Sequence, residues 1–292
     1  MFAGTFTALV TPFQNDQIDE AAFQRLIEAQ IAGGINGIVP VGTTGESPTL
    51  DHDEHIRVIE LGVKFANGRC KVIGGTGSNS TREAIAMTVE AEKLGCDAAL
   101  LVAPYYNRPS QQGIFRHFGA IAEATKLPLI LYSIPSRCGI EIGVDTTARL
   151  VAEYPNIVAI KEAGGSVERV SALRAAVPEP FEILSGDDSL TLPFMSVGAS
   201  GVISVASNLI PREVGDMVGA ALAGNFVEAR RLHLHWYRLF KDLFIEPNPV
   251  PAKHALALQD RMAADVRLPL CPLLPASASR LEETLRTLQL IP

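Results

Sequence analysis

The chain has 292 residues, of which 47% are hydrophobic and 20% charged, so it carries enough apolar material for a large globular core. Its formal net charge is -7 and no basic run occurs, which argues against nucleic acid and against an anionic membrane surface as partners. The longest apolar runs, such as 98–104, are far shorter than the roughly 20 residues of a membrane helix. The first twelve residues lack the charged leader of a signal peptide, so we expect a soluble cytoplasmic protein.

Strand-like and helix-like patterns alternate eight times along the first 224 residues. The predicted strands are 4–10, 37–41, 71–75, 97–103, 128–132, 157–161, 182–185 and 201–205. The predicted helices start after the capping residues Asp19, Asp51 and Ser80, cover 110–125, 145–153, 167–176 and 188–197, and open for the eighth time at Pro211. Continuous apolar strands separated by helices imply a parallel sheet that is covered on both faces. Eight such units predict a (β/α)8 barrel.

The pattern changes at Gly224 and Asn225, after which no strand-like run recurs. A single apolar stripe at helical spacing follows, made of Leu232, Trp236, Leu239, Phe240 and Leu243. Further helices are predicted over 252–259 and 278–288. We therefore predict a catalytic barrel over 1–224 and a small C-terminal helical domain over 225–292.

Lys161 ends the apolar run that starts at Ile157, and a lysine in that place is costly to bury. One interpretation pairs its amine with a carboxylate such as that of Glu162. The other makes it a nucleophile that forms a Schiff base with a carbonyl substrate. In a barrel of this type the reacting groups follow the C-terminal ends of the strands. The side chains predicted at those ends include Thr43, Thr44, Tyr105, Tyr106, Tyr132 and Arg137. Their convergence with Lys161 on one rim favours the nucleophile.

No bound cofactor or metal is predicted. The sequence contains neither a dinucleotide GxGxxG motif nor a P-loop, and the four cysteines show no paired spacing. His52 and His55 are three residues apart and could share a helix face, but no further ligand pattern lies nearby.

Several motifs together resemble the dihydrodipicolinate synthase family along the whole chain. They are GTTGES at 42–47, PYYNRP at 104–109, YSIPSRCG at 132–139, IKEA at 160–163, SGDD at 185–188 and EPNPVPAK at 246–253. Members of this family condense pyruvate with L-aspartate 4-semialdehyde, the committed step towards diaminopimelate and lysine. Some of these motifs alone mark only the wider superfamily of pyruvate-dependent aldolases. The alternatives are therefore an N-acetylneuraminate lyase, another sugar-acid aldolase or dehydratase, or a catalytically silent barrel.

The resemblance implies a role for each residue of the rim. Lys161 forms a covalent imine with pyruvate, and no separate cofactor is needed. Thr44, Tyr132 and Tyr106 form a proton relay, with Tyr106 reaching in from a neighbouring subunit of a homodimer or homotetramer. The pyruvate carboxylate is held at Thr43 and Thr44.

Three further positions complete the implied substrate pocket. Arg137 binds the carboxylate of the semialdehyde, a task suited to a planar guanidinium. Gly186 and Ile203 shape the pocket wall.

A second, regulatory site is also implied. Six residues match positions at which some family members bind L-lysine as a feedback inhibitor across a dimer interface: Ser47, His52, His55, Asn79, Glu83 and Tyr105. Pro48 stands where a smaller residue is common in the family.

Overall fold

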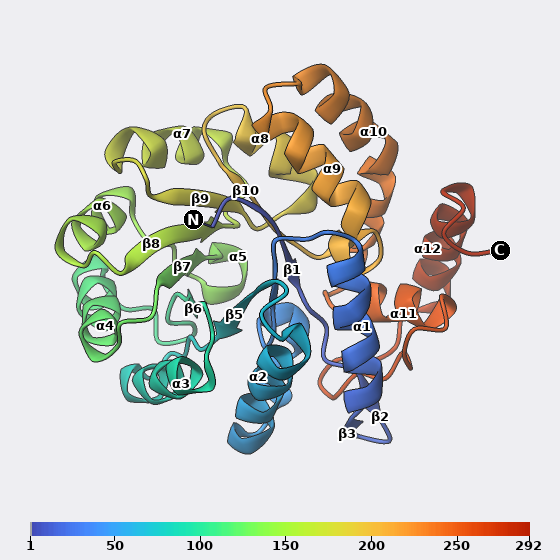
Figure 1. Ribbon diagram of the computed structural model, residues 1–292, viewed down its shortest axis with the longest axis horizontal. Coiled ribbons are helices and arrows are strands. Elements are labelled where there is room, and N and C mark those ends of the chain that lie inside the picture. Colours follow the sequence, from blue (N-terminus) through green and yellow to red (C-terminus); the bar gives the residue numbers. More distant parts are fainter. Residues whose placement is uncertain (1) are drawn as a thin grey trace.

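The computed structural model describes residues 2–292 and contains a closed barrel of eight parallel strands, which confirms the predicted (β/α)8 fold (Figure 1). Around the barrel the strands follow the order β1-β10-β9-β8-β7-β6-β5-β4. They are β1 (Gly4–Ala8), β4 (Gly37–Val39), β5 (Lys71–Gly75), β6 (Ala98–Val102), β7 (Leu129–Ser133), β8 (Ile157–Glu162), β9 (Glu182–Ser185) and β10 (Gly201–Ser204). Each corresponds to one predicted strand, although β1 and β4 end two residues earlier than expected.

A ring of helices surrounds the barrel, one after each strand (Figure 1). They are α1 (Glu20–Ala32), α2 (His52–Ala66), α3 (Thr81–Leu94), α4 (Gln111–Ala124), α6 (Val144–Glu153), α7 (Val167–Ala176), α8 (Thr191–Met195) and α9 (Pro211–Leu222).

The predicted N-caps Asp19, Asp51 and Ser80 are present, and the cap at Asp51 is a complete capping box, whereas the cap at Ser80 is not. Asp51 and Glu54 exchange both hydrogen bonds at the start of α2. At α3 the hydroxyl of Ser80 accepts from the backbone N–H of Glu83, whereas the Glu83 carboxylate accepts from the hydroxyl of Ser78 instead. The Glu83 side chain is thus directed away from the cap.

The expected helix over 188–197 is replaced by the 3-10 turn η3 (Asp188–Leu190) followed by the short helix α8. The Asp187 side chain caps the turn by accepting from the N–H of Ser189 at 2.8 Å. Short elements that lack enough residues to show a period were not predicted. They are the hairpin β2 (Phe13–Gln14) and β3 (Gln17–Ile18), the helix α5 (Pro135–Cys138), and the 3-10 turns η1 (Thr43–Gly45), η2 (Ser47–Thr49) and η4 (Ala206–Asn208).

Three helices form the C-terminal region, in which α10 packs against α9 (Figure 1). They are α10 (Phe226–Asp242), α11 (Val250–Leu258) and α12 (Pro275–Thr287). The predicted stripe packs inward, since Trp236, Leu239, Phe240 and Leu243 are all buried. Buried Asp242 ties α10 to α12 by accepting from Arg280 and from Thr284. The division into two domains at residue 224 stays a prediction.

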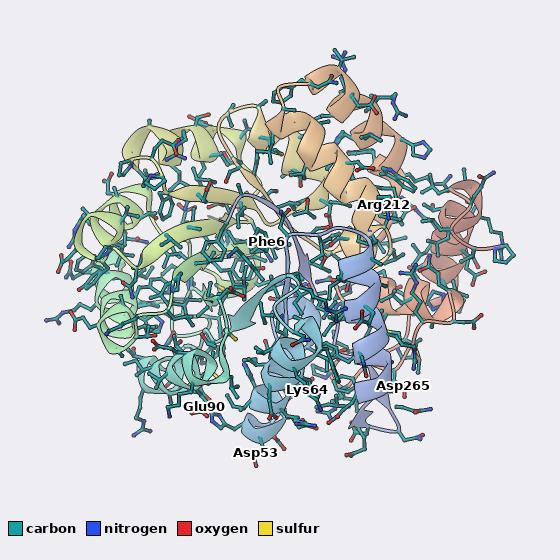
Figure 2. The ribbon with its side chains drawn as sticks, in the orientation of Figure 1. Phe6, Asp53, Lys64, Glu90, Arg212 and Asp265 are labelled. Carbon is teal, nitrogen blue, oxygen red and sulfur yellow. The ribbon has the colours of Figure 1, made fainter. Side chains whose placement is uncertain are left out.

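The core has two parts. One fills the interior of the barrel, where Phe6 is fully buried, and the other lies between the strands and the surrounding helices. Figure 2 shows Phe6 near the barrel centre and Asp53, Lys64 and Glu90 on the outer helices. Across residues 2–292, no helix combines the length and the apolar character that crossing a membrane would require.

Candidate active site

Lys161 lies inside the mouth of the barrel. Successive side chains of a strand point to opposite faces, so Ala159 and Lys161 of β8 face the barrel interior while Ile160 faces the helices. Lys161 pairs in register with Tyr132 of β7 on one side and with Leu184 of β9 on the other. Only 6% of Lys161 is exposed, and its Nζ lies 4.4 Å from the centroid of the Tyr132 ring.

Glu162 does not pair with Lys161, which contradicts the interpretation of Lys161 as one half of that ion pair. The Glu162 side chain is buried on the outer face of β8 and accepts from the guanidinium of Arg169 at 2.8 Å and from the N–H of Gly164 at 2.7 Å. Burial raises the pKa of Glu162, and Arg169 opposes this rise. The amine of Lys161 therefore lies in the barrel interior, on the opposite face of β8 from Glu162.

Burial lowers the pKa of Lys161 from 10.5 to about 8, because desolvation disfavours the ammonium form. The negative charge of Asp188 opposes this shift, and the guanidinium of Arg137 reinforces it. At pH 7 a group with a pKa of about 8 is neutral in roughly one molecule in ten, whereas at the ordinary value it is neutral in about one in 2,500. The site therefore supplies a much larger fraction of nucleophilic amine.

Asp188 is a functional candidate that the sequence analysis did not identify. Its carboxylate accepts from the hydroxyl of Ser204 at 2.5 Å and from the N–H groups of Val205 and Ala206 at 3.1 and 3.0 Å. Burial raises its pKa to about 6. The only available signal was an aspartate shortly after a strand, and nothing in the sequence showed that its carboxylate meets Ser204 at the end of β10.

Because Gly186 has no side chain, it leaves room for the side chain of Lys161. A Cβ at this position would lie 3.1 Å from Cε of Lys161 and 2.6 Å from Cβ of Ala163. Ile203 of β10 is buried in the same interior cluster. The structure thus places both residues in the barrel interior, and Gly186 directly against Lys161.

Thr43 and Thr44 have different neighbours, and Thr43 lies beside Tyr132, whereas the family resemblance assigned Thr44 to the relay. Burial raises the pKa of the Tyr132 phenol to about 12, and the nearby Thr43 hydroxyl opposes this shift. The Thr44 hydroxyl instead accepts from Nδ2 of Asn248 at 2.9 Å. Adjacent residues of a 3-10 turn such as η1 are about 120° apart, so the two threonines face different neighbours.

Arg137 is presented by α5 at the entrance to the barrel. Its Nη2 donates to the backbone carbonyl of Asn248 at 3.3 Å. Asn248 lies between α10 and α11, so the C-terminal region contacts both Arg137 and Thr44. The sequence analysis noted the motif around Asn248 but assigned this residue no role.

Tyr106 does not enter the site of its own chain. Its side chain is 90% exposed, and its backbone has the left-handed φ of 70°. It borders neither of the cavities at the barrel mouth. This position is compatible with the predicted insertion into a neighbouring subunit.

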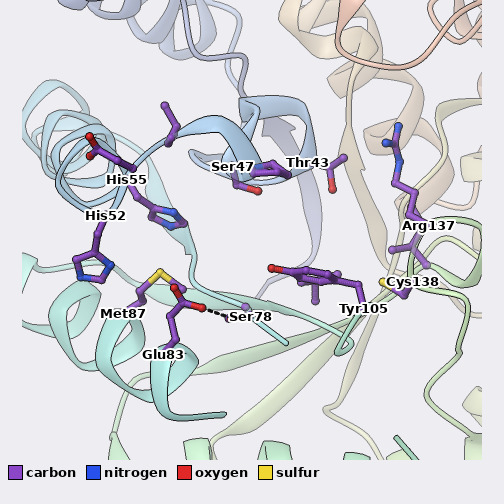
Figure 3. Close-up of a pocket in the computed structure, with 16 residues that line it drawn as sticks. Thr43, Ser47, His52, His55, Ser78, Glu83, Met87, Tyr105, Arg137 and Cys138 are labelled. Carbon is purple, nitrogen blue, oxygen red and sulfur yellow. Dashed lines mark hydrogen bonds between the residues drawn. The ribbon is translucent and has the colours of Figure 1, made fainter. Parts of the chain in front are cut away.

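A cavity of about 400 Å³ extends outward from the barrel mouth (Figure 3). Thr43 and Arg137 line one end of it. Five of the six residues predicted to form a regulatory site also line it: Ser47, His52, His55, Glu83 and Tyr105. The sixth, Asn79, lies outside the lining and donates through Nδ2 to the backbone carbonyl of Tyr105. A smaller cavity of about 30 Å³, bordered by Thr43 and Tyr132, adjoins the first.

Two side chains on the outer wall of the large cavity are held in place. The His55 ring is hydrogen-bonded through Nε2 to the carbonyl of Gly75 at 2.7 Å, and burial lowers its pKa. Glu83 accepts from Ser78, as Figure 3 shows. The wall therefore presents a carboxylate and a histidine towards the space that Tyr105 faces.

The sequence and the fold both match known proteins. The model of the dihydrodipicolinate synthetase (DHDPS) family matches residues 1–288. A 4-hydroxy-tetrahydrodipicolinate synthase of Sulfurihydrogenibium sp. is 51% identical over 292 residues, which is 100% of each chain. The solved structure of a 4-hydroxy-tetrahydrodipicolinate synthase from Methylacidiphilum fumariolicum SolV is 57% identical with a TM-score of 0.95, again over 100% of each chain. A DHDPS from Cyanidioschyzon merolae with lysine bound is 42% identical over 99% of each chain, with a TM-score of 0.97. The chain belongs to the dihydrodipicolinate synthetase family.

Proposed function

We propose that this chain is a lyase that condenses pyruvate with L-aspartate 4-semialdehyde to give 4-hydroxy-tetrahydrodipicolinate. The observation that carries the proposal is the buried amine of Lys161, whose pKa is lowered to about 8 inside the barrel mouth and which no carboxylate neutralises by direct contact among residues 2–292. The relatives named above carry this activity in their names and align with the whole chain.

The proposed reaction starts with the neutral amine of Lys161. It attacks the keto carbon of pyruvate, and loss of water gives an imine. Loss of a proton from the methyl carbon gives an enamine, whose carbon forms the new bond to the aldehyde carbon of the second substrate. The amino group of that substrate then attacks the imine carbon, which closes the ring and releases Lys161. The imine is the only covalent carrier, so no separate cofactor takes part.

Hydroxyl groups move the protons in this scheme. Tyr132 adjoins Lys161 and has Thr43 beside it, and each hydroxyl can both donate and accept. Tyr106 of a neighbouring subunit completes the relay. Arg137 lies with Thr43 at the barrel-mouth end of the large cavity and binds the carboxylate of the semialdehyde, which favours this substrate over a sugar acid recognised through hydroxyl groups.

Borohydride trapping tests the Schiff base. With pyruvate and borohydride, intact mass and peptide mapping should place one stable adduct on Lys161. The variant Lys161→Arg keeps the charge but cannot form the imine, and it should stay unmodified. A folded protein that remains unmodified under these conditions would exclude the imine mechanism.

Substrate choice needs a second measurement. Turnover with pyruvate and L-aspartate 4-semialdehyde should be compared with cleavage of N-acetylneuraminate. Activity on the sugar acid alone would reject the proposed second substrate. Absence of both activities, together with absence of the adduct, would favour a silent barrel.

We also propose that L-lysine inhibits the enzyme from the outer end of the large cavity. The support is the group of His55, Glu83 and Tyr105 along its wall and the lysine-bound relative. Millimolar L-lysine should slow turnover, and Glu83→Gln should relieve that inhibition because it removes the charge that would face an ammonium group. Glu90→Gln, on the outside of α3, is the matched control and should stay sensitive. An insensitive starting protein would remove this proposal.

The partner contribution of Tyr106 can be tested by complementation. We propose a homodimer or a homotetramer in which each site borrows this tyrosine. Tyr106→Phe and Lys161→Arg should each be inactive alone. An equal mixture that is unfolded and refolded together should recover about a quarter of the normal activity, because about half of the pairs are hybrids and one of the two sites in each hybrid is complete. A mixture that stays inactive, although hybrids form, would place Tyr106 outside the relay.

A further inference from the structure

A fully buried ion pair joins the turn that carries Thr43 and Thr44 to the C-terminal region. Glu46 directly follows η1, and Lys253 lies on α11, 207 residues later in the chain. The exposed fractions of their side chains are 1% and 0%, and Nζ of Lys253 donates directly to Oε1 of Glu46. No other ion pair among residues 2–292 has both side chains buried to this degree.

The Glu46 carboxylate and the Lys253 amine each make a further hydrogen bond besides the one that joins them. The second carboxylate oxygen of Glu46 accepts from the N–H of Arg267 at 3.1 Å. Nζ of Lys253 also donates to the carbonyl of Asp265 at 2.8 Å and lies 4.2 Å from the centroid of the Phe13 ring. Such a pair contributes little net stability compared with apolar residues of the same volume, but it fixes the position of what it joins.

The ion pair holds the residue that ends the η1 turn. Glu46 has φ of 57°, a left-handed conformation that is uncommon for a residue with a side chain, and its N–H closes η1 by donating to the carbonyl of Thr43 at 3.1 Å. Two neighbouring contacts hold the same turn. Thr11 donates to the carbonyl of Gly45 at 2.7 Å, and Asn248 donates to the hydroxyl of Thr44. The turn that carries Thr43 and Thr44 is therefore held at three points, namely the Thr44 hydroxyl, the Gly45 carbonyl and the Glu46 carboxylate.

We propose that Glu46 and Lys253 are positioning residues for pyruvate: they hold the η1 turn so that its backbone N–H groups meet the substrate carboxylate. The inference rests on the function proposed above. Neither side chain reaches the cavities at the barrel mouth, so both act through Thr43 and Thr44. The C-terminal region is thereby part of the pyruvate site without contributing a group that touches pyruvate.

The test compares Glu46→Gln, Lys253→Met and the double variant in the full-length protein. The measurements are the KM for pyruvate, the KM for the semialdehyde, kcat and the midpoint of thermal unfolding. Each single variant leaves one buried group without its partner, so the unfolding midpoint should fall. The KM for pyruvate should rise about tenfold or more, while kcat and the KM for the semialdehyde change less than about threefold.

The double variant separates positioning from stability. Gln and Met are neutral and similar in volume to the native side chains, so the unfolding midpoint should recover. The KM for pyruvate should stay raised, because the connection across the turn is still missing. If both quantities recover together, the pair has a structural role only and the inference is wrong. If a single variant does not fold, the double variant still tests the inference. A raised KM for pyruvate at a normal unfolding midpoint supports positioning, and a normal KM contradicts it.

Asp242→Asn is the matched control. It removes a buried charge that ties α10 to α12 in the same C-terminal region but lies away from the η1 turn. It should lower the unfolding midpoint and leave the KM for pyruvate unchanged. An equal rise in KM for this variant would also contradict the inference. Failure of the proposed function would look different, since the unmodified chain would then neither turn over nor form the borohydride adduct.

Discussion

Lys161 and Tyr132 are direct neighbours across β8 and β7, and the amine nitrogen lies 4.4 Å from the centre of the tyrosine ring. The ring face attracts an ammonium group, whereas burial disfavours the charged form. Burial lowers the pKa of the amine to about 8. The same tyrosine has Thr43 beside its phenol, so one strand neighbour lies between the amine and a hydroxyl group at the mouth.

The pH dependence of imine formation follows from this pKa. Only the neutral amine attacks pyruvate, so the rate of pyruvate-dependent modification of Lys161 should rise with pH and level off above about pH 8. The rate rises with pH because the amine must lose a proton before it attacks, and the midpoint of the rise lies at the lowered pKa of Lys161. Rapid mixing with pyruvate followed by a borohydride quench at pH 6 to 10 measures it. A rate that still rises steeply between pH 9 and 10 would mean that the amine keeps its ordinary pKa.

Gly186→Ala should block the site without unfolding the barrel. The added Cβ would lie 2.6 Å from Cβ of Ala163 and 3.1 Å from Cε of Lys161, so the lysine chain must move. A displacement of about 1 Å at the nucleophile can reduce the rate by roughly a hundredfold. Circular dichroism and the yield of the borohydride adduct are the two measurements. Gly215→Ala, at a position where an added Cβ meets nothing within 4 Å, is the control and should keep full activity.

Thr43 and Thr44 should behave differently although they are adjacent. Thr43→Val removes the hydroxyl next to Tyr132 and should lower kcat by about 10² or more, because a proton relay is interrupted. Thr44→Val removes only the acceptor for Asn248 and should change kcat much less. Thr43→Ser restores a hydroxyl and should recover most of the activity. Equal losses at the two positions would contradict the relay that the structure indicates.

Most of the barrel could be predicted from the sequence because its signals are local. Each strand is a short apolar run, and each helix has a stripe or a cap within its own residues, as Asp51 and Glu54 show at α2. The position of Lys161 at the end of such a run was likewise visible. The structure then excluded its pairing with Glu162, because the two side chains lie on opposite faces of β8.

Features that depend on three-residue turns or on distant contacts could not be predicted. The direction of each threonine depends on the η1 turn, which has no sequence period, so the sequence could not show which of the two lies beside Tyr132. Asn248 meets Thr44 across 204 residues, and Lys253 meets Glu46 across 207. The motifs around these residues were recognised, but only the folded chain shows that they touch.

His117 should make the protein less stable in acid. It is buried between α4 and α3, with Nδ1 2.9 Å from the hydroxyl of Thr81, and Nε2 has no hydrogen-bond partner among residues 2–292. Burial lowers its pKa from 6.5 to about 4. Between these two values the unfolded chain binds a proton that the folded chain does not. The free energy of unfolding should therefore fall as the pH drops from about 6.5 to 4, by about 3 kcal/mol from this residue.

The variant His117→Gln isolates that contribution. It removes the titrating group, so its free energy of unfolding should decline less steeply than that of the unmodified chain between pH 6.5 and 4. The variant is expected to be less stable at pH 7, because it disturbs a buried site, and the gap should narrow or reverse at pH 4. His235→Gln, at an exposed position on α10, is the control and should leave the slope unchanged. Urea unfolding at several pH values measures both slopes. Parallel curves for His117→Gln and the unmodified chain would show that His117 takes up its proton in the folded state.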